Sequence, residues 1–592
     1  MNIKDMVSGI LDFDFSFPVE EISSEGLYVK YDGSSAIVGS YAPNALARAY
    51  MLLAKGIREG KTCFEITQKP RFSDCGVMLD MSRGSVMSVS GVKKYLDCMA
   101  LHGMNMLMLY TEDTYEVEGY PYMGYQRGRY SIRELRELDD YAASLGIELI
   151  PCIQTLGHME KFLRYGVNAH LRESDRILLP GSEPTYEFIE ACIASVRKSF
   201  RTKRIHIGCD EAHGLGHGTL FKKNGQLLDP FDIFNKHVHR VVDICNKYDF
   251  HPMMWSDMYF SIAAPIGSGD FGINVQVPQH VIDAMPDVDM VFWDYYKTNN
   301  EFYGTTIQKH QAFGHKTIFA GGIWTWNGFV PNFQWTYATA KPALEECLRY
   351  GVDFVMGTSW VNGGAEVSHM LATPCLSLYS EHCWLGEACT DEDIRSVAAF
   401  ITGVPFEVTE AVSDFFCRMG GDHCIGQKII WSDPLINLLC YDYDYPAIES
   451  LYSAALETLE KYPNVPDMDY YKKVFRCALH KVKLQQTLRD HYKTDDKAWL
   501  ADFSQNTIPV MLKDFEDLYH SHYELWHRDY KTQGYEMNMN RFAGAIERIR
   551  YTGWMIDRYV AGEIDEIEAL EPELIQGKKQ KHVGRDRVLQ SF

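Results

Sequence analysis

Eight apolar segments, each followed by a loop and then by a segment of helical periodicity, constrain the fold of this sequence most. The first ends at GVMLD, residues 76–80, and the last is DFVMGTS, residues 353–359. Their apolar residues run continuously, as expected of parallel strands that are buried on both faces. Eight strands that alternate with helices favour a closed (β/α)8 barrel over a doubly wound sheet. We therefore predict an α/β fold with a TIM barrel over residues 71–384.

The residues on either side of this repeat have different patterns. Residues 1–70 contain strand-like segments and one helical segment, which predicts a small α/β domain. From residue 385 to 592 the apolar residues recur at helical spacing, for example over 447–462 and 470–492, which predicts an α-helical C-terminal domain. The basic tail at 575–587 is expected to be a loose end. A chain of 592 residues exceeds what one hydrophobic core usually serves, so three domains are expected.

Charge and cysteine content exclude several classes of protein. The formal net charge of -22 argues against a nucleic-acid partner and against an anionic membrane surface. The first residues, MNIKDMVSGILDFDF, lack the basic and apolar regions of a secretory signal, and no apolar run is long enough to span a membrane. The 15 cysteines are scattered without any C-x-x-C pair, which predicts free thiols. A cytoplasmic location is therefore expected.

Polar and aromatic side chains gather where the predicted strands end, which is where barrels of this kind place their active sites. In chain order they are Asp80, Arg83, Glu112, Asp113, Gln154, His158, His206, Asp210, Glu211, Trp255, Asp257, Trp293, Asp294, Tyr295, Tyr296, Trp324, Trp326, Trp360, Asn362 and Glu366. Carboxylates, one arginine and several indoles suit a neutral polyhydroxylated ring held between aromatic walls. Taken alone, an Asp–Glu pair is usually a solvated surface feature, and a tryptophan usually packs in the core. Their shared position at the strand ends favours a site.

The segment HIGCDEAHG, residues 206–214, resembles the H-x-G-G-D-E signature of glycoside hydrolase family 20, the β-N-acetylhexosaminidases. The resemblance extends over roughly residues 72–366. The segments LDMSRG, LGHMEKF, MMWSD, WDYY and SWVNGGAE are similar to family segments that carry substrate-binding residues, here Arg83, His158, Trp255, Asp294, Tyr296, Trp360 and Glu366.

The sequence departs from the family pattern in three places. Cys209 stands where a second glycine is usual. The segment LYTED after the second strand lacks the histidines that are common there, and it has Glu in place of the first Asp. The spacing from Trp360 to Glu366 is longer than the usual W-x-E. These differences place the chain in a divergent branch.

The resemblance implies a retaining exo-β-N-acetylhexosaminidase that removes terminal GlcNAc or GalNAc without a cofactor or metal. In this mechanism the 2-acetamido oxygen of the substrate attacks the anomeric carbon and forms an oxazolinium intermediate. Glu211 would act as acid and base, and Asp210 would orient the acetamide. Trp255, Trp326 and Trp360 would form the walls of the acetamide pocket, with Trp324 as an alternative. Tyr296 would donate a hydrogen bond to the acetamide oxygen. Arg83 and Glu366 would bind the distal hydroxyls of the sugar. Burial and the charge of Asp210 are expected to raise the pKa of Glu211.

The expected partners are β-linked N-acetylhexosaminide oligosaccharides or glycoconjugates. The C-terminal helices have three roles open to them: shaping the site, forming a homodimer, or stabilising the barrel. Two alternative functions also remain. One is a metal-dependent barrel hydrolase that uses the nearby histidines His206, His213, His217, His237 and His239. The other is a catalytically inactive protein that binds amino sugars.

Overall fold

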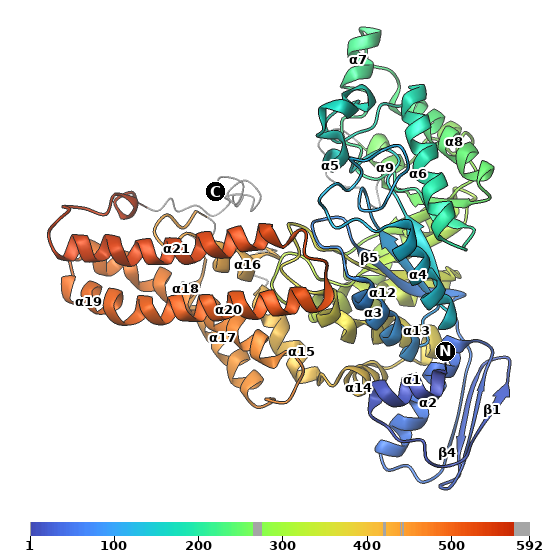
Figure 1. The fold of residues 1–592 in the computed structure, drawn as a ribbon, viewed down its shortest axis with the longest axis horizontal. Coiled ribbons are helices and arrows are strands. Elements are labelled where there is room, and N and C mark those ends of the chain that lie inside the picture. The colour runs from blue at the N-terminus through green and yellow to red at the C-terminus, as the bar shows by residue number, and fades with distance from the viewer. Residues whose placement is uncertain (1, 265–274, 418–421, 439, 441–442, 574–592) are drawn as a thin grey trace. The chain divides into compact units, whose positions relative to one another are not determined.

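The computed structural model describes residues 2–264, 275–417, 422–438, 440 and 443–573 (Figure 1). The basic segment 575–587 lies outside the described residues. The chain divides into two compact units: Met1–Ile323 with Thr336–Trp360 and Thr373–Thr402, and Trp324–Trp335 with Val361–Ala372 and Gly403–Phe592. The three-domain division predicted from the sequence is finer than these two units and stays a prediction.

Eight parallel strands close into a barrel in the first unit, which confirms the predicted TIM barrel. They are β5 (Asp74–Asp80), β6 (Met106–Tyr110), β7 (Glu148–Cys152), β8 (Arg204–His206), β9 (His251–Trp255), β10 (Asp289–Trp293), β11 (Thr317–Gly322) and β12 (Phe354–Ser359). Each strand pairs with its neighbour in chain order, and β12 returns to pair with β5. Because all strands run in the same direction, their carboxyl ends form one rim, which carries the candidate site.

Fully buried aliphatic side chains fill the barrel interior, among them Met78, Met108, Ile150 and Met356. The outer layer consists of helices that alternate with the strands: α3 (Val89–Leu101), α4 (Ile132–Ser144), α6 (Glu183–Ser199), α8 (Pro230–Lys247), α11 (Asn300–Gln311), α12 (Phe333–Tyr350) and α13 (Leu376–Leu385). Since the strands are covered by side chains inside and by helices outside, continuous apolar sequences are what this position requires.

The N-terminal part of the first unit is a four-stranded sheet in the order β1 (Val19–Ser23), β3 (Ala36–Ser40), β2 (Leu27–Tyr31) and β4 (Phe64–Gln68). Helices α1 (Ile3–Leu11) and α2 (Pro43–Arg58) belong to this part, and α2 contacts both the sheet and barrel helix α3. Arg48 of α2 is fully buried, and each of its terminal nitrogens donates a 2.7 Å hydrogen bond to Glu381 of α13. This paired charge joins the N-terminal part to the barrel.

The second unit is helical, as the periodicity of the C-terminal sequence predicts. Its helices include α15 (Phe406–Ser413), α16 (Ile425–Trp431), α17 (Tyr445–Glu460), α18 (Met468–Lys493), α20 (Ile508–Asp529) and α21 (Tyr535–Val560). The four long helices pack in succession, α17 on α18, α18 on α20 and α20 on α21. Over the described residues, none of the helices has the length and apolar character needed to span a bilayer.

Candidate active site

The chain makes a tight turn directly after β8, and this turn carries the acidic pair. Gly208, Cys209 and Glu211 all adopt left-handed backbone angles, with φ of 70°, 70° and 46°. A Cβ atom at Gly208 would lie 2.1 Å from Gln154 Oε1, so glycine is required there for the close approach of that side chain. The left-handed angle at Cys209 explains why glycine is the usual residue at that position. Strained backbone of this kind concentrates at functional sites.

Asp210 is held by contacts to both of its carboxylate oxygens. Gln154 Nε2 donates a 2.8 Å hydrogen bond to Oδ1, and His158 Nε2 forms an ion pair with Oδ2 at 3.2 Å. Burial opposes ionisation of this carboxyl, but the charge and hydrogen bond of His158 outweigh it and lower the pKa of Asp210 to about 2. Asp210 is therefore a fixed anion at neutral pH.

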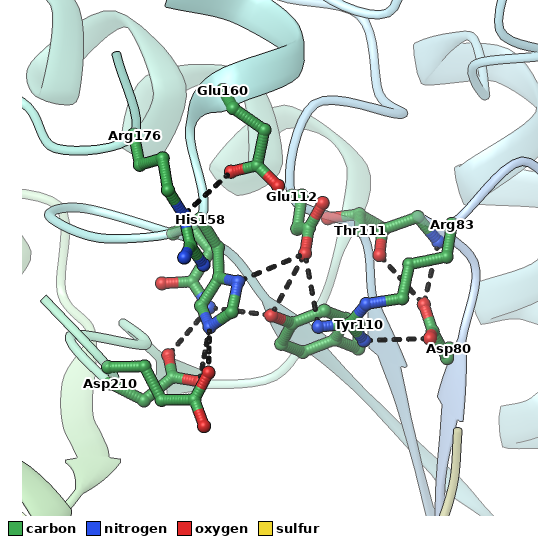
Figure 2. A network of polar contacts seen from close by, with 12 residues as sticks. Asp80, Arg83, Tyr110, Thr111, Glu112, His158, Glu160, Arg176 and Asp210 are labelled. Carbon is green, nitrogen blue, oxygen red and sulfur yellow. Dashed lines mark hydrogen bonds and ion pairs between the residues drawn. The ribbon is translucent and has the colours of Figure 1, made fainter. Parts of the chain in front are cut away.

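His158 lies among three carboxyl groups, as Figure 2 shows for two of them. Its Nε2 atom is 3.2 Å from Asp210 and 3.4 Å from Glu211, and its Nδ1 atom is 3.8 Å from Glu112. Burial disfavours the charged imidazole, yet the neighbouring anions, Asp210 foremost, raise the pKa of His158 to about 11. The residue is therefore an imidazolium that neutralises part of the acidic cluster.

Glu211 corrects one expectation from the sequence. The structure shows its pKa lowered, not raised, because the hydrogen bond from His158 outweighs burial and the charge of Asp210. Its side chain is 42% exposed, compared with 12% for that of Asp210. Its backbone N–H donates a 3.1 Å hydrogen bond to Asp257 Oδ2, which anchors the left-handed turn. The two adjacent carboxylates thus lie in different environments.

Arg83 lies at the end of β5 between charged and aromatic neighbours. Its Nη1 atom donates a 2.8 Å hydrogen bond to Asp80, and its Nη2 atom is 3.5 Å from Glu112 (Figure 2). The guanidinium carbon lies 5.2 Å from the ring centre of Tyr110 and 5.1 Å from that of Trp360. These contacts fix the guanidinium, and burial raises the pKa of the nearby Glu112 to about 7.

Trp255 and Trp360 lie in the same aromatic group. Their ring centres are 6.2 Å apart, and the ring of Trp255 is 4.5 Å from that of His206. Burial raises the pKa of Asp257 to about 8, and the charge of Asp210 adds to this effect. Within the described residues, the indole N–H of Trp255 and Oδ1 of Asp257 are buried and have no hydrogen-bond partner. Buried polar atoms of this kind are suited to binding a polar ligand.

Asp294 and Tyr296, the two predicted residues after β10, differ in their contacts and exposure. Asp294 Oδ1 accepts 2.9 Å hydrogen bonds from the backbone N–H groups of Tyr296 and Lys297, and a 3.0 Å bond from Tyr303 Oη. Tyr296 itself is 49% exposed. The buried neighbour Tyr295 stacks on Trp293, and the charge of Asp210 is among the causes that raise its pKa, after burial. The substrate contacts predicted for Asp294 and Tyr296 stay predictions, and Tyr295 is a further candidate for the hydrogen bond assigned to Tyr296.

Three predicted residues belong to the second unit. Trp324 and Trp326 stack there with ring centres 4.1 Å apart. Glu366 is buried, and its Oε1 atom accepts hydrogen bonds from Arg541 Nη1 at 3.0 Å and Trp431 Nε1 at 3.3 Å. The roles predicted for these three side chains in sugar binding stay predictions.

Three of the five histidines of the metal-hydrolase alternative have ordinary structural contacts. His237 Nε2 bonds the carbonyl of Thr155 at 2.9 Å, and His239 Nε2 bonds the carbonyl of Ala284 at 3.0 Å. Burial lowers the pKa of His206 to about 3, and its Nδ1 atom accepts the N–H of Gly208. The described residues contain no group of three or more His, Cys, Asp or Glu side chains that could hold a metal ion.

Four residues of this cluster were not assigned a role from the sequence: Tyr110, Glu112, Gln154 and Asp257. Tyr110 is the last residue of β6, and its hydroxyl donates to Glu112 at 3.2 Å and accepts from Gln154 Nε2 at 2.9 Å. Glu112, Gln154 and Asp257 are among the strand-end side chains named from the sequence without a role. Tyr110 is not among them, although its position as the last residue of β6 is the same kind of signal.

The charge state of His158 is directly testable. We expect its imidazole to remain doubly protonated at pH 8 and to titrate at lower pH in Asp210→Asn, because that change removes its main charge partner. Nitrogen-15 NMR of the histidine rings measures both effects. Asp294→Asn is the matched control, since Asp294 bonds the turn after β10 and should leave His158 unchanged. A neutral His158 at pH 7 in the unmodified protein would contradict the geometry.

Comparison with known proteins agrees with this arrangement. The sequence model of the glycosyl hydrolase family 20 catalytic domain matches residues 72–322, and that of the glycoside hydrolase 20C C-terminal domain matches residues 426–589. Hexosaminidase D of Homo sapiens is 33% identical over 256 residues, which cover 41% of this chain and 49% of that protein. Hexosaminidase D of Bos taurus is 28% identical over 254 residues, which cover 41% of this chain and 69% of that protein. The match therefore spans about half the length of the human relative.

The fold has known counterparts as well. The X-ray structure of Flavobacterium johnsoniae chitobiase superimposes with a TM-score of 0.51 at 14% identity, covering 82% of this chain and 87% of that one. The two family models together match more than half of the chain, and the catalytic one includes Arg83, His158, Asp210 and Glu211. The chain therefore belongs to glycoside hydrolase family 20.

Proposed function

We propose that this chain is a retaining exo-β-N-acetylhexosaminidase that releases terminal GlcNAc or GalNAc by substrate-assisted catalysis. The observation that carries the proposal is the unequal environment of two adjacent carboxylates. Glu211 is partly exposed and forms an ion pair with His158. Asp210 is buried, accepts a hydrogen bond from Gln154 and forms an ion pair with His158 as well. A carboxylate held in this way is a poor nucleophile, but it is well placed to accept a hydrogen bond.

Asp210 orients the acetamide of the substrate in this mechanism. Its negative charge accepts the acetamide N–H and stabilises the positive charge that develops as the acetamide oxygen attacks the anomeric carbon. The nucleophile therefore belongs to the substrate, and the oxazolinium ring takes the place of a covalent enzyme intermediate. The buried indole of Trp255 and the partly buried indole of Trp360 exclude water from the acetamide, which protects the cyclic intermediate from early hydrolysis.

Glu211 protonates the departing oxygen and then accepts a proton from the incoming water. In the free protein its pKa is lowered by His158, so the carboxyl is ionised at neutral pH. Substrate binding removes water from the carboxylate and raises its pKa. Glu211 takes up this proton from solvent as the substrate binds, gives it to the departing oxygen and recovers it from the incoming water, so the cycle balances. The imidazolium of His158, whose Nε2 atom lies 3.4 Å from Glu211 Oε2, stabilises the carboxylate between the two steps. Arg83, fixed by Asp80 and two rings, supplies donors to the distal hydroxyls of a terminal sugar.

A reducing compartment is proposed together with this activity. All 15 cysteines are free thiols, and most of them are buried in apolar surroundings. This state supports the cytoplasmic location expected from the sequence.

The acid role of Glu211 predicts a leaving-group dependence. Glu211→Gln should lower kcat by about 10²- to 10⁴-fold for a β-linked disaccharide and much less for an aryl β-N-acetylglucosaminide with a good leaving group. Glu137→Gln, on the exposed face of α4, makes the same chemical change away from the site and should have no effect. Equal losses with both substrates would contradict acid catalysis by Glu211. Absence of turnover in the unmodified protein would favour an inactive sugar-binding protein.

The acetamide role of Asp210 predicts weaker binding of an intermediate mimic. A thiazoline analogue of the cyclic intermediate should bind Asp210→Asn about 10- to 100-fold less tightly, because a charge-assisted hydrogen bond is lost. Inhibition constants measured beside those of the exposed Asp140→Asn variant test this. Equal thiazoline affinity in the unmodified protein and Asp210→Asn would remove the assigned role.

A further inference from the structure

Three tyrosines form a group on the loops that follow β6 and β7, and two of them are exposed while Tyr165 is partly buried. Tyr122 is 41% exposed and Tyr125 is 49% exposed. The ring of Tyr122 lies 6.1 Å from that of Tyr125 and 4.7 Å from that of Tyr165. We call these three residues the tyrosine cluster. Apolar ring surface left in water is unfavourable, and neighbouring exposed rings of this kind are typical of binding sites.

The first loop holds its two tyrosines outward on a rigid base. Met123, between them, is fully buried. Gly124 has a φ of 61°, and a Cβ atom there would lie 2.4 Å from the carbonyl oxygen of Asp113. Arg127 Nε donates a 3.0 Å hydrogen bond to Asp113, and its Nη2 atom bonds the carbonyl of Ser82. The exposure of the rings therefore belongs to an ordered loop.

The anchor points of this loop are neighbours of the catalytic cluster. Asp113 follows Glu112, which contacts His158 and Arg83, and Ser82 precedes Arg83. The tyrosine loop is thus tied directly to the rim of the barrel at which the site lies. Loops on this rim are the parts of such barrels that contact substrate.

Tyr165 is positioned from the second loop. It follows α5 (Glu160–Leu163), which begins two residues after His158. The guanidinium of Arg164 lies 5.1 Å from the ring centre of Tyr165, and its Nη2 atom donates a 3.2 Å hydrogen bond to the hydroxyl. Arg172 Nη2 bonds the backbone carbonyl of Tyr165 at 3.0 Å. The cluster therefore combines flat apolar faces with fixed hydrogen-bond donors, and a pyranose ring has the complementary apolar face and hydroxyl edge.

We propose that the tyrosine cluster binds the sugar on the reducing side of the cleaved bond, so that the protein selects oligosaccharide leaving groups. The inference rests on the proposed glycosidase function. An exo-enzyme holds one terminal sugar at its carboxylates, and the remainder of the chain must then leave along the rim of the barrel. The ordered rings on two loops that carry site residues provide a surface for that remainder.

The test compares substrates that differ only beyond the terminal sugar. The variants are Tyr122→Ala, Tyr165→Ala and Tyr122→Leu, the last of which keeps apolar volume but removes the flat ring. Each should lower kcat/KM for a β-linked N-acetylglucosamine trisaccharide about threefold to tenfold, in line with the loss of one aromatic contact. Inhibition by the thiazoline analogue, which fills only the terminal-sugar position, should change less than twofold. Tyr41→Ala, which removes a 50% exposed ring from the loop between β3 and α2, is the control.

The outcomes separate this inference from the function on which it rests. Failure of the unmodified protein to cleave both an aryl N-acetylglucosaminide and the trisaccharide would overturn the proposed function, and the inference with it. Cleavage of both with unchanged trisaccharide kinetics in the variants would overturn only the inference. Equal losses for thiazoline binding and trisaccharide cleavage would show general damage and also overturn it. A dimer in sedimentation experiments that Tyr122→Ala dissociates would show that a second copy covers the cluster, which would overturn it as well.

Discussion

The site depends on one shared cation. His158 lies within 4 Å of Asp210, Glu211 and Glu112. Its positive charge offsets the electrostatic repulsion between these three carboxyl groups in a largely buried site. The imidazolium keeps Asp210 ionised and lowers the pKa of Glu211. The same interaction thus gives two carboxylates that are adjacent in sequence different environments. The proposed mechanism relies on this difference.

The barrel and the turn after β8 make this sharing possible. Parallel strands bring Glu112, His158 and Asp210 from three different loops to one rim. The left-handed angles at Cys209 and Glu211 then turn the side chains of Asp210 and Glu211 in different directions. The hydrogen bond from the Glu211 N–H to Asp257 holds the backbone of Glu211 in place. Gln154, two residues after β7, and Asp257, two residues after β9, bond this strained turn, so its conformation depends on the closed barrel.

Sequence patterning predicted the barrel well because buried parallel strands leave a clear signal of eight apolar runs. It also predicted the region of the site, since the polar side chains follow those runs. It could not predict the distances between loops, and this explains the wrong expectation for Glu211: burial and the Asp210 charge were considered, but the proximity of His158 was not. The same limit applies to Asp257, whose bond to the turn depends on its folded geometry.

In the proposed mechanism the nucleophile belongs to the substrate, which requires two inversions at the anomeric carbon and net retention. Proton NMR of the reaction mixture, recorded before mutarotation during cleavage of an aryl β-N-acetylglucosaminide, measures the configuration of the first sugar released. We expect the β-anomer as the initial product. Initial release of the α-anomer would show direct attack by water and would contradict the role assigned to Asp210 and the acetamide.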